Sequence, residues 1–343
     1  MKKITTILLS TLLIGSIALA TGCGSSGTAS NTPSSGSDSG QKEYTIKLPG
    51  VGSGLTSIDS VSIAIEKGFF KEQNIKIENV GNINIPQYVA AISSGTIDGA
   101  LLMASDGVAA IDNGAGFIEV ATGRDSVEGN PHMTYVTLKD NAGISRGKDL
   151  VGKKVGVSSK LGCTAGFPLE YAAQDGVENP LNSISFVVAQ EVTLVDALRK
   201  GSVDVVGLHL PEAVINKLYP DVKVLFTDNT ILQDRGGDIG WFFPKKFVDA
   251  NPEAIKGFVT AIAKANDWIN ANPEEAKELY WKINPNVNKD TFVINHFAEH
   301  GLIQESHVQI WLDVLGSGKS IQTLKNKWTF DQIATNKYNP NAK

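Results

Sequence analysis

Short apolar strands alternate with short helices along most of the chain, and this order limits the possible folds more than any other feature of the sequence. Residues 44–51 alternate apolar and polar side chains as a strand does, and the helix that follows could be capped by Ser57 or Asp59. The same succession continues to Thr122 and begins again at Lys154. Parallel strands need helical crossovers, so the sequence predicts an α/β fold with mostly parallel sheets in two units of similar size.

A ten-residue pattern occurs once in each unit, at residues 89–98 and 195–204. Each copy reads as a helix, a glycine that ends it, and a strand that opens with an aspartate, Asp98 in the first and Asp204 in the second. We interpret the pair as a weak internal repeat of topology. The alternative is that unrelated helix ends share the same chemistry.

The chain changes character after Gly240. A short strand is predicted at residues 241–243 and helices at 252–270, 273–282, 289–300 and 304–315. Asn251-Pro252 and Asn272-Pro273 are typical helix starts. This tail has no sheet of its own, so we expect it to return to the first unit and pack there.

The first residues resemble a bacterial export signal. Lys2 and Lys3 precede an apolar stretch, residues 4–19, which is too short to span a membrane comfortably. Residues 19–23, which end in Cys23, resemble the lipobox of bacterial lipoproteins. We therefore expect a signal peptide at 1–22, lipidation of Cys23 and a Gly/Ser-rich tether at 23–43, which place the body on the extracytoplasmic face of the cell membrane. The alternative is an ordinary secreted protein with a chance cysteine.

Composition excludes several classes of protein. The chain has 31 Lys and Arg against 36 Asp and Glu, a net charge of −5, and no basic stripe, so nucleic acid is not an expected partner. Its two cysteines are Cys23 and Cys163, and if Cys23 is acylated no disulfide supports the fold. A monomer with a sizeable apolar core is expected.

Motifs spread over residues 44–315 together resemble one family, the ABC-importer binding proteins for nitrate, sulfonates and taurine, and thiamine precursors. Each motif is helix-end chemistry and weak alone, but their order matches throughout. The matching segments are residues 64–70, 74–78, 91–98, 149–157, 197–204 with Pro211, and 252–276.

The resemblance implies two lobes joined by two crossing segments, with a ligand between them, as in type II periplasmic binding proteins. Lobe 1 would hold residues 44–136 and 239–343, and lobe 2 residues 137–238. The implied function is capture of a small, anionic or heterocyclic ligand for a permease and its ATPase, without catalysis, cofactor or metal. A lipoprotein that presents ligand to a receptor, or a secreted enzyme on the same fold, remains an alternative.

Ligands of open α/β sheets bind beyond the carboxyl ends of the strands, where glycines and helix starts expose backbone N–H groups. Hydroxyls and helix starts at these ends suit an anionic oxygen, and Arg124 could balance its charge. For Ser105 and Thr164, helix capping is an equal alternative. The expected ligand-binding residues are Ser53, Gly54, Leu55, Met103, Ala104, Ser105, Ser158, Lys160, Gly162, Cys163, Thr164, His209 and Trp241.

Two enzymatic hypotheses compete with simple binding. His296-Phe-Ala-Glu-His300 matches the inverted zinc-peptidase motif on a predicted helix, although no third ligand is evident and a polar helix face is the better interpretation. Cys163 follows Gly162 at a helix start, a setting that can lower a thiol pKa, and His209 could approach it.

Overall fold

The structure is a computed structural model that describes residues 42–84, 87–160, 162–319 and 323–343. The expected signal peptide, Cys23 and nearly all of the tether lie outside the described residues. Residues from Gln41 onward belong to one compact unit. No helix in the described ranges is long and apolar enough to cross a membrane.

Lobe 1 is built on five strands. Strand β1 (Tyr44–Leu48) pairs in parallel with β2 (Ile75–Asn79), and β10 (Ile239–Pro244) lies between β3 (Ala100–Met103) and β4 (Phe117–Arg124), antiparallel to both. The backbone N–H of Asp98, just before β3, donates to the Lys47 carbonyl of β1 at 2.9 Å. The two groups of strands are thereby joined side by side, in the order β2-β1-β3-β10-β4.

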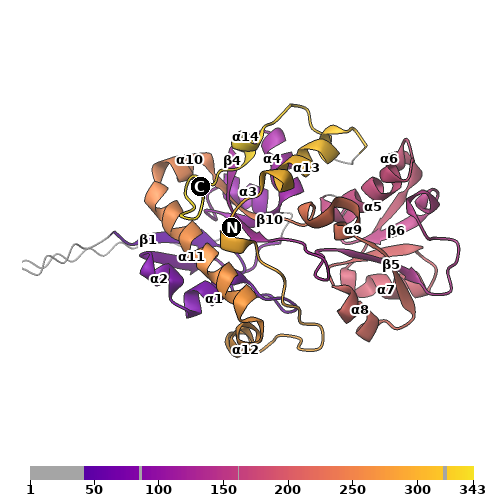
Figure 1. Ribbon diagram of the computed structural model, residues 1–343, viewed down its shortest axis with the longest axis horizontal. Helices are drawn as coiled ribbons and strands as arrows, with labels where there is room; N and C mark the ends of the chain where they lie inside the picture. The colour runs from indigo at the N-terminus through magenta and orange to yellow at the C-terminus, as the bar shows by residue number, and fades with distance from the viewer. Residues whose placement is uncertain (1–41, 85–86, 161, 320–322) are drawn as a thin grey trace, which may run out of the picture. The chain divides into compact units, whose positions relative to one another are not determined.

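Helices surround these strands (Figure 1). The Asp59 carboxylate caps α1 by accepting from Ser62 N–H at 2.7 Å, as one of the two predicted caps, and Gly68 ends the turn after it with a φ of 77°. The helices of lobe 1 before the crossing are α1 (Ser60–Glu66), α2 (Phe69–Glu72), α3 (Tyr88–Ser93) and α4 (Ala104–Asp112).

Lobe 2 contains a five-stranded sheet in the order β7-β6-β8-β5-β9. The central β8 is parallel to β6, and β5 is antiparallel to both β8 and β9. Its strands are β5 (Thr134–Leu138), β6 (Lys154–Val157), β7 (Ser185–Val188), β8 (Val205–Leu208) and β9 (Val222–Thr227). Its helices are the short η2 (Gly147–Leu150), α5 (Cys163–Gln174), α6 (Pro180–Ser183), α7 (Glu191–Arg199), α8 (Glu212–Leu218), α9 (Asp228–Leu232) and η3 (Gln233–Arg235).

The internal repeat predicted from the sequence extends to individual hydrogen bonds. In lobe 1 the Asp98 carboxylate accepts from Lys47 N–H at 2.8 Å, and in lobe 2 the Asp204 carboxylate accepts from Lys154 N–H at 2.8 Å. Each aspartate also donates its own N–H to the carbonyl of the same lysine. The two lobes therefore share their strand order. In each lobe an aspartate joins one strand to another, β3 to β1 in lobe 1 and β8 to β6 in lobe 2.

The crossing strands explain why the sheets are less parallel than predicted. Strand β5 enters lobe 2 and β10 enters lobe 1, each against the direction of its neighbours. The sequence predicted no strand at β5 and placed the lobe boundary at 136/137, inside it. Strand pairing assigns all of β5 to the second sheet, so the first crossing spans residues 125–133 and the second spans about residues 236–238.

A buried carboxylate holds the two crossings together. Asp228 accepts from Met133 N–H at 2.8 Å and donates its own N–H to the Met133 carbonyl at 3.1 Å. Gly237 of the second crossing lies so close that an added Cβ would come 2.1 Å from the Ser126 Cβ of the first crossing and 2.8 Å from the Asp228 carboxylate. No side chain fits there, so the close approach requires glycine.

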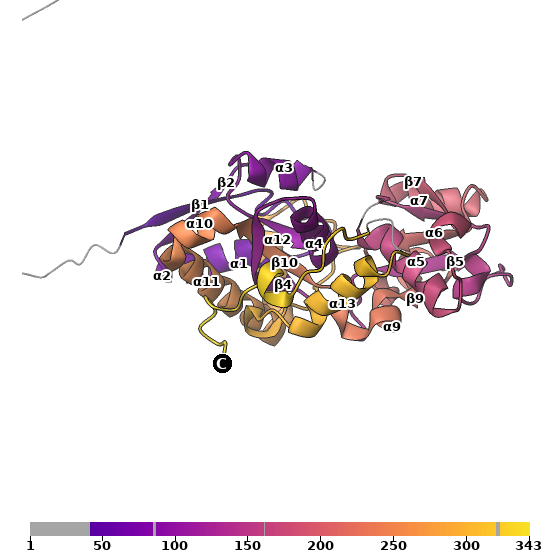
Figure 2. The same ribbon diagram turned by 90° about the horizontal axis from the view of Figure 1, so that it is seen from above.

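The tail packs on lobe 1, as predicted. In Figures 1 and 2 the long helix α11 lies beside α1 and α10, and its Phe258 stacks on Phe70 with ring centroids 5.7 Å apart. The buried Asn266 amide donates to the carbonyls of Thr122 and Gly123 at 3.1 Å, which fixes the end of β4. The tail helices are α10 (Lys245–Ala250), α11 (Pro252–Ala271), α12 (Pro273–Ile283), η4 (Glu299–Gly301), α13 (Glu305–Gly316) and α14 (Phe330–Ile333).

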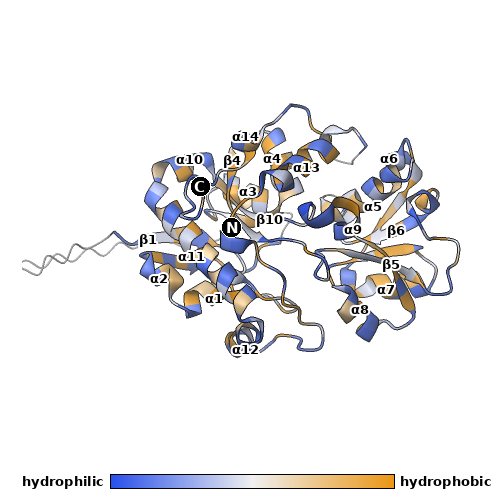
Figure 3. Ribbon diagram, in the orientation of Figure 1, coloured by the Kyte–Doolittle hydropathy of each residue, from blue (hydrophilic) through white to orange (hydrophobic). Residues whose placement is uncertain are grey.

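Apolar side chains gather on the strands and on the inner sides of the helices, whose outer sides are polar (Figure 3). One buried cluster joins the lobes, where Phe167 of α5 contacts Trp311 of α13 with ring centroids 5.5 Å apart. Helix α5 begins at Cys163, directly after Gly162.

The predicted helix at residues 289–300 is wrong. This segment is mostly extended and irregular, and Val293 forms a bridge with Ser57 beside α1. Val293 N–H donates to the Thr56 carbonyl of lobe 1 at 2.8 Å instead of to a helical neighbour. Tertiary contacts have therefore overridden the apolar spacing that suggested a helix.

Substitution of Gly237 tests the contact between the crossings. Gly237→Ala forces a Cβ against Ser126 and is expected to lower the free energy of unfolding by about 1–3 kcal/mol. Gly116→Ala is the matched control, since its added Cβ meets nothing within 4 Å, and it should change stability by less than about 0.5 kcal/mol. Urea unfolding measures both, and equal stabilities of the two variants would contradict the contact.

Candidate functional site

The carboxyl ends of β3 and β4 lie at the same level of lobe 1, because Met103 and Arg124 both pair with Ile239 of β10. Ser105 follows in the first turn of α4. Its hydroxyl is fully buried, and no other group of the described chain bonds to it. A buried donor without a partner is costly, so a ligand oxygen would stabilise it.

Arg124 places a guanidinium group at this edge, and only some of its N–H donors have hydrogen-bond partners. One terminal nitrogen donates to Asn295 Oδ1 at 2.9 Å, whereas its Nε–H is buried and bonds to no group of the described chain. Burial lowers the pKa of Arg124, and the nearby Asp59 carboxylate opposes that shift. The guanidinium still carries its charge at neutral pH, so this end of lobe 1 offers a charged donor to an anion.

The facing edge of lobe 2 brings together His132, Cys163 and His209. His132 lies in the first crossing, Cys163 begins α5, and His209 follows β8. The Cys163 Sγ lies 3.5 Å from His132 Nε2, and the ring centroids of the two histidines are 5.0 Å apart. The donor atoms of the three side chains lie within 4.8 Å of one another.

Cys163 and His132 of this cluster are held in their neutral forms. Burial raises the pKa of the Cys163 thiol well above its usual value, and the Asp106 charge adds to the shift. Burial also lowers the pKa of His132, which His209 and Arg124 lower further. The thiolate–imidazolium pair of a cysteine nucleophile is therefore disfavoured at neutral pH.

Asp106 places a carboxylate of lobe 1 against the start of α5. A Cβ built on Gly162, whose φ is 63°, would come 2.5 Å from Asp106 Oδ1. Burial raises the pKa of Asp106 to about 6. The two lobes thus meet where Asp106 of α4 lies against Gly162, the residue before α5.

Of the predicted ligand residues, the structure brings Cys163 and His209 together and places Gly162 against Asp106, the residue after Ser105. Thr164 is buried, and its hydroxyl donates to the Ser159 carbonyl at 2.5 Å, so it stabilises the loop before α5. Ser158 and Lys160 are exposed in that loop.

The remaining predicted residues divide into a surface loop and a core. Ser53 is exposed and its hydroxyl donates to the Gly50 carbonyl at 2.6 Å, while the Leu55 side chain is 53% exposed. The Gly54 carbonyl accepts from Tyr280 and Asn284 of the tail. The core residues are Met103, Ala104 and Trp241, of which Trp241 packs edge-on against Phe258.

The structure separates the two histidines of the zinc-peptidase motif. His296 Nδ1 lies 2.5 Å from Asp125 Oδ1, and His300 Nδ1 lies 2.7 Å from Asp267 Oδ2. Because the segment is not helical, the two imidazoles do not share a helix face. Each histidine therefore has its own carboxylate partner, and the motif does not form a two-histidine metal site.

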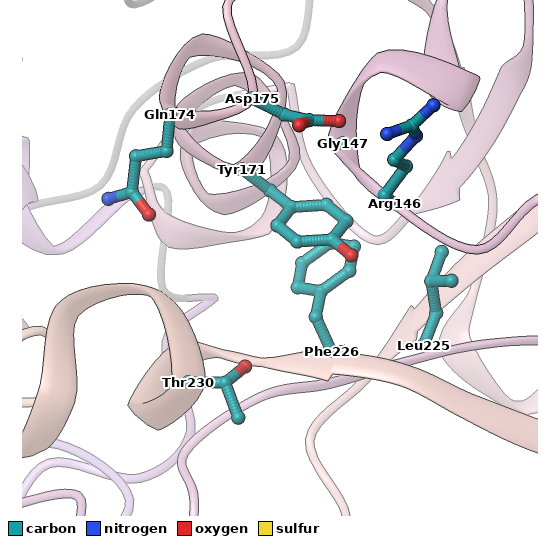
Figure 4. A pocket seen from close by; sticks show the side chains of 8 residues that line it. All are labelled: Arg146, Gly147, Tyr171, Gln174, Asp175, Leu225, Phe226 and Thr230. Atoms are coloured by element: carbon teal, nitrogen blue, oxygen red, sulfur yellow. The ribbon is translucent and has the colours of Figure 1, made fainter.

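Two pockets in the described part of the chain are lined neither by Ser105 and Arg124 nor by the His132, Cys163 and His209 cluster. One, of about 330 Å³, is inside lobe 2, where the stacked rings of Tyr171 and Phe226 form one wall (Figure 4). The other, of about 400 Å³, lies where the tail meets both crossings and is lined by Asp125, Asp238 and His307 among others. Neither is lined by any of the predicted ligand residues.

Sequence reasoning missed His132 and Asp106. His132 stands in an irregular segment that the sequence did not identify as the first crossing, and Asp106 was interpreted as part of a helix. The usable signal is positional and concerns Asp106 alone, which lies in the first turn of a helix at a strand's carboxyl end; His132 lies two residues before β5, a strand that the sequence did not predict.

Two lobes of the same topology, joined by two crossing segments, define the fold of periplasmic binding proteins. Two solved structures share it, each with a TM-score of 0.64 and 14% identity. The alkanesulfonate-binding protein SsuA from Xanthomonas axonopodis pv. citri bound to MOPS matches over 86% of this chain and 99% of its own. The periplasmic nitrate-binding protein NrtA from Synechocystis PCC 6803 matches over 87% of each chain. At this identity the likeness concerns the fold alone.

A family model described as NMT1/THI5 like matches residues 56–276, and the chain belongs to this family. A Brucella abortus binding protein is 25% identical over 227 residues, which are 64% of this chain and 65% of that protein, so less than two thirds of the relative is covered. A 4-amino-5-hydroxymethyl-2-methylpyrimidine phosphate synthase of Saccharomyces cerevisiae is 23% identical, over 77% of this chain and 79% of its own. The predicted family and fold are thereby confirmed.

The raised pKa of Asp106 predicts how the stability of the protein depends on pH. In the folded protein this carboxyl keeps its proton to about pH 6, whereas in the unfolded chain it loses it near 3.8, so its contribution to stability falls as pH rises between these values. Asp106→Asn is expected to raise the free energy of unfolding at pH 7, by at most about 3 kcal/mol, with little effect near pH 3.5.

Asp112, on the same helix, is the matched control. Burial tends to raise its pKa, but hydrogen bonds from Lys325, Trp328 and Asn326 outweigh burial and lower it. Asp112→Asn should therefore lose stability at pH 7. Urea titrations at both pH values measure the two variants, and an Asp106→Asn variant less stable than the parent at pH 7 would contradict the assignment.

Proposed function

We propose that this protein is the solute-binding subunit of an ABC importer, which captures a small anionic molecule between its lobes and delivers it to a membrane permease. The observation that carries the proposal is that two buried donors, Arg124 Nε and Ser105 Oγ, are both unsatisfied and stand at the carboxyl ends of β4 and β3, on either side of β10. Buried polar groups are normally satisfied, and a bound anion would satisfy both.

The ligand class follows from the chemistry of these donors. A guanidinium and a hydroxyl suit the tetrahedral or planar oxygens of sulfonate, nitrate or carboxylate. The relatives support this class, since one neighbour binds alkanesulfonate and another binds nitrate. The His132 imidazole and the Cys163 thiol add hydrogen-bond donors and acceptors from lobe 2.

We propose binding without catalysis. The structural neighbours are binding proteins, whereas the yeast relative is named a synthase. The state of Cys163 favours binding, because a buried and protonated thiol is a poor nucleophile. Export also favours import over a biosynthetic role, since the N-terminal sequence predicts that the body works outside the cytoplasm.

Arg124→Gln tests the anion site. The variant is expected to lose about 10- to 100-fold in affinity for an anionic ligand, because a hydrogen bond to a charged group is lost. Arg199→Gln is the control, because Arg199 is paired with Asp221 on the surface of lobe 2. Calorimetric titration follows a thermal-shift screen of nitrate, taurine, alkanesulfonates and pyrimidine precursors. A panel that leaves the melting temperature unchanged, or equal affinities of both variants, would overturn the proposal.

Membrane attachment through Cys23 is tested separately. Cys23→Ser is expected to move the protein from the membrane fraction to the soluble fraction of its native host, because one thiol carries the proposed lipid anchor. Cys163→Ser is the control and should remain with the membranes. A Cys23→Ser protein that still sediments with membranes would contradict the anchor.

A further inference from the structure

We propose that His132, Cys163 and His209 bind one divalent transition-metal ion of the zinc type in tetrahedral geometry, with the fourth position open. The sequence predicted no metal site, and the cluster became visible only when the fold joined three separate segments. Each residue comes from a different element: the first crossing, the start of α5 and the end of β8. Imidazole nitrogen and cysteine sulfur are the donors that zinc prefers in proteins.

The spacing of the donors fits such an ion. Zinc binds sulfur at about 2.3 Å and imidazole nitrogen at about 2.0–2.1 Å, so the S···N edge of a tetrahedral site is about 3.6 Å long. The Cys163 Sγ and His132 Nε2 already lie 3.5 Å apart. The third donor lies within 4.8 Å of both, so the His209 side chain needs to move by only about 1 Å to complete the set.

His209 is already oriented as a metal ligand. Its Nδ1 lies 2.6 Å from Glu191 Oε2, and its backbone N–H donates to Glu191 Oε1 at 2.7 Å. This carboxylate fixes the ring and leaves Nε2 as the nitrogen available to a metal. Histidine ligands of zinc typically have such a carboxylate partner on the other ring nitrogen, which also makes the ligand more basic.

The charges around the cluster favour a cation. Asp106 lies against Gly162, the residue before Cys163, and the Glu191 carboxylate holds His209, so two carboxylates stand beside the cluster. A divalent ion binds cysteine as the thiolate and releases the thiol proton to solvent. The ion exchanges one proton on sulfur for one metal–sulfur bond, so no oxidant or reductant takes part.

The proposed metal site uses side chains other than Arg124 and Ser105, the two donors on which the proposed function rests. Metal binding itself does not depend on the proposed function. Loss of zinc binding with solute binding intact would overturn only the metal site, and the reverse result would overturn only the importer proposal.

Cobalt(II) is the direct probe, used with purified full-length protein after chelator treatment and dialysis. We expect one cobalt per chain, a thiolate-to-cobalt charge-transfer band and intense visible bands of tetrahedral cobalt, all displaced by Zn²⁺. The chain's other cysteine provides a matched control: Cys163→Ser should abolish the charge-transfer band, and Cys23→Ser should retain it. Cobalt bound without a thiolate band would overturn the proposal, and this result requires no variant to fold.

Zinc titrations of histidine and glutamate variants complete the test. His132→Gln and His209→Gln should weaken zinc binding by more than about 100-fold, and Glu191→Gln by about 10- to 100-fold, because it orients His209 without binding the metal. The control is His300→Gln, whose imidazole is paired with Asp267. Zinc affinity that is the same in all four variants would overturn the site.

Discussion

The arrangement of this protein depends on one buried carboxylate. Asp228 accepts the Met133 N–H of the first crossing and lies against Gly237 of the second, so a single side chain fixes the point at which the chain passes twice between its lobes. Burial raises the pKa of Asp228, even though hydrogen bonds from Ser126, Met133 and His132 oppose that shift. Burial of a carboxylate costs desolvation free energy, so Asp228 is retained for a structural reason. Its hydrogen bonds to the first crossing set the position of His132.

Anchoring of both crossings at one point brings the carboxyl ends of the two sheets together. Lobe 1 contributes a buried guanidinium and a buried hydroxyl, and lobe 2 contributes neutral imidazole and thiol groups. A guanidinium and a hydroxyl on one side, with further hydrogen-bonding groups on the other, suit an anion, and the imidazole and thiol groups also carry the separate proposal of a metal site. Burial makes Cys163 a poor nucleophile, and in that proposal its thiol gives up the proton when the metal binds.

The fold could be predicted from the sequence because its signals are local. Asp59, Gly68 and the two aspartates of the repeat mark the ends of helices and strands, and the structure uses each of them there. The segment at residues 289–300 was predicted wrongly because its apolar residues pack against α1 and α12 as an extended chain. Strand β5 was missed because it belongs to a crossing, whose partners lie far away in the sequence.

The candidate site was only partly predictable for the same reason. Cys163 and His209 stand at strand ends and helix starts, where the chemistry of open sheets predicts ligand residues. His132 has no such signal, because its neighbours are set by Asp228, 96 positions further along the chain. Trp241 could not be separated from a core residue by sequence alone, since an aromatic side chain at a strand suits either environment.

A crystal structure of the protein with a bound alkanesulfonate tests the central claim most directly. The account predicts electron density for the sulfonate between the lobes, within hydrogen-bonding distance of Arg124 and Ser105. Density in the lobe 2 pocket beside Tyr171 and Phe226, with Arg124 and Ser105 free of ligand, would contradict it.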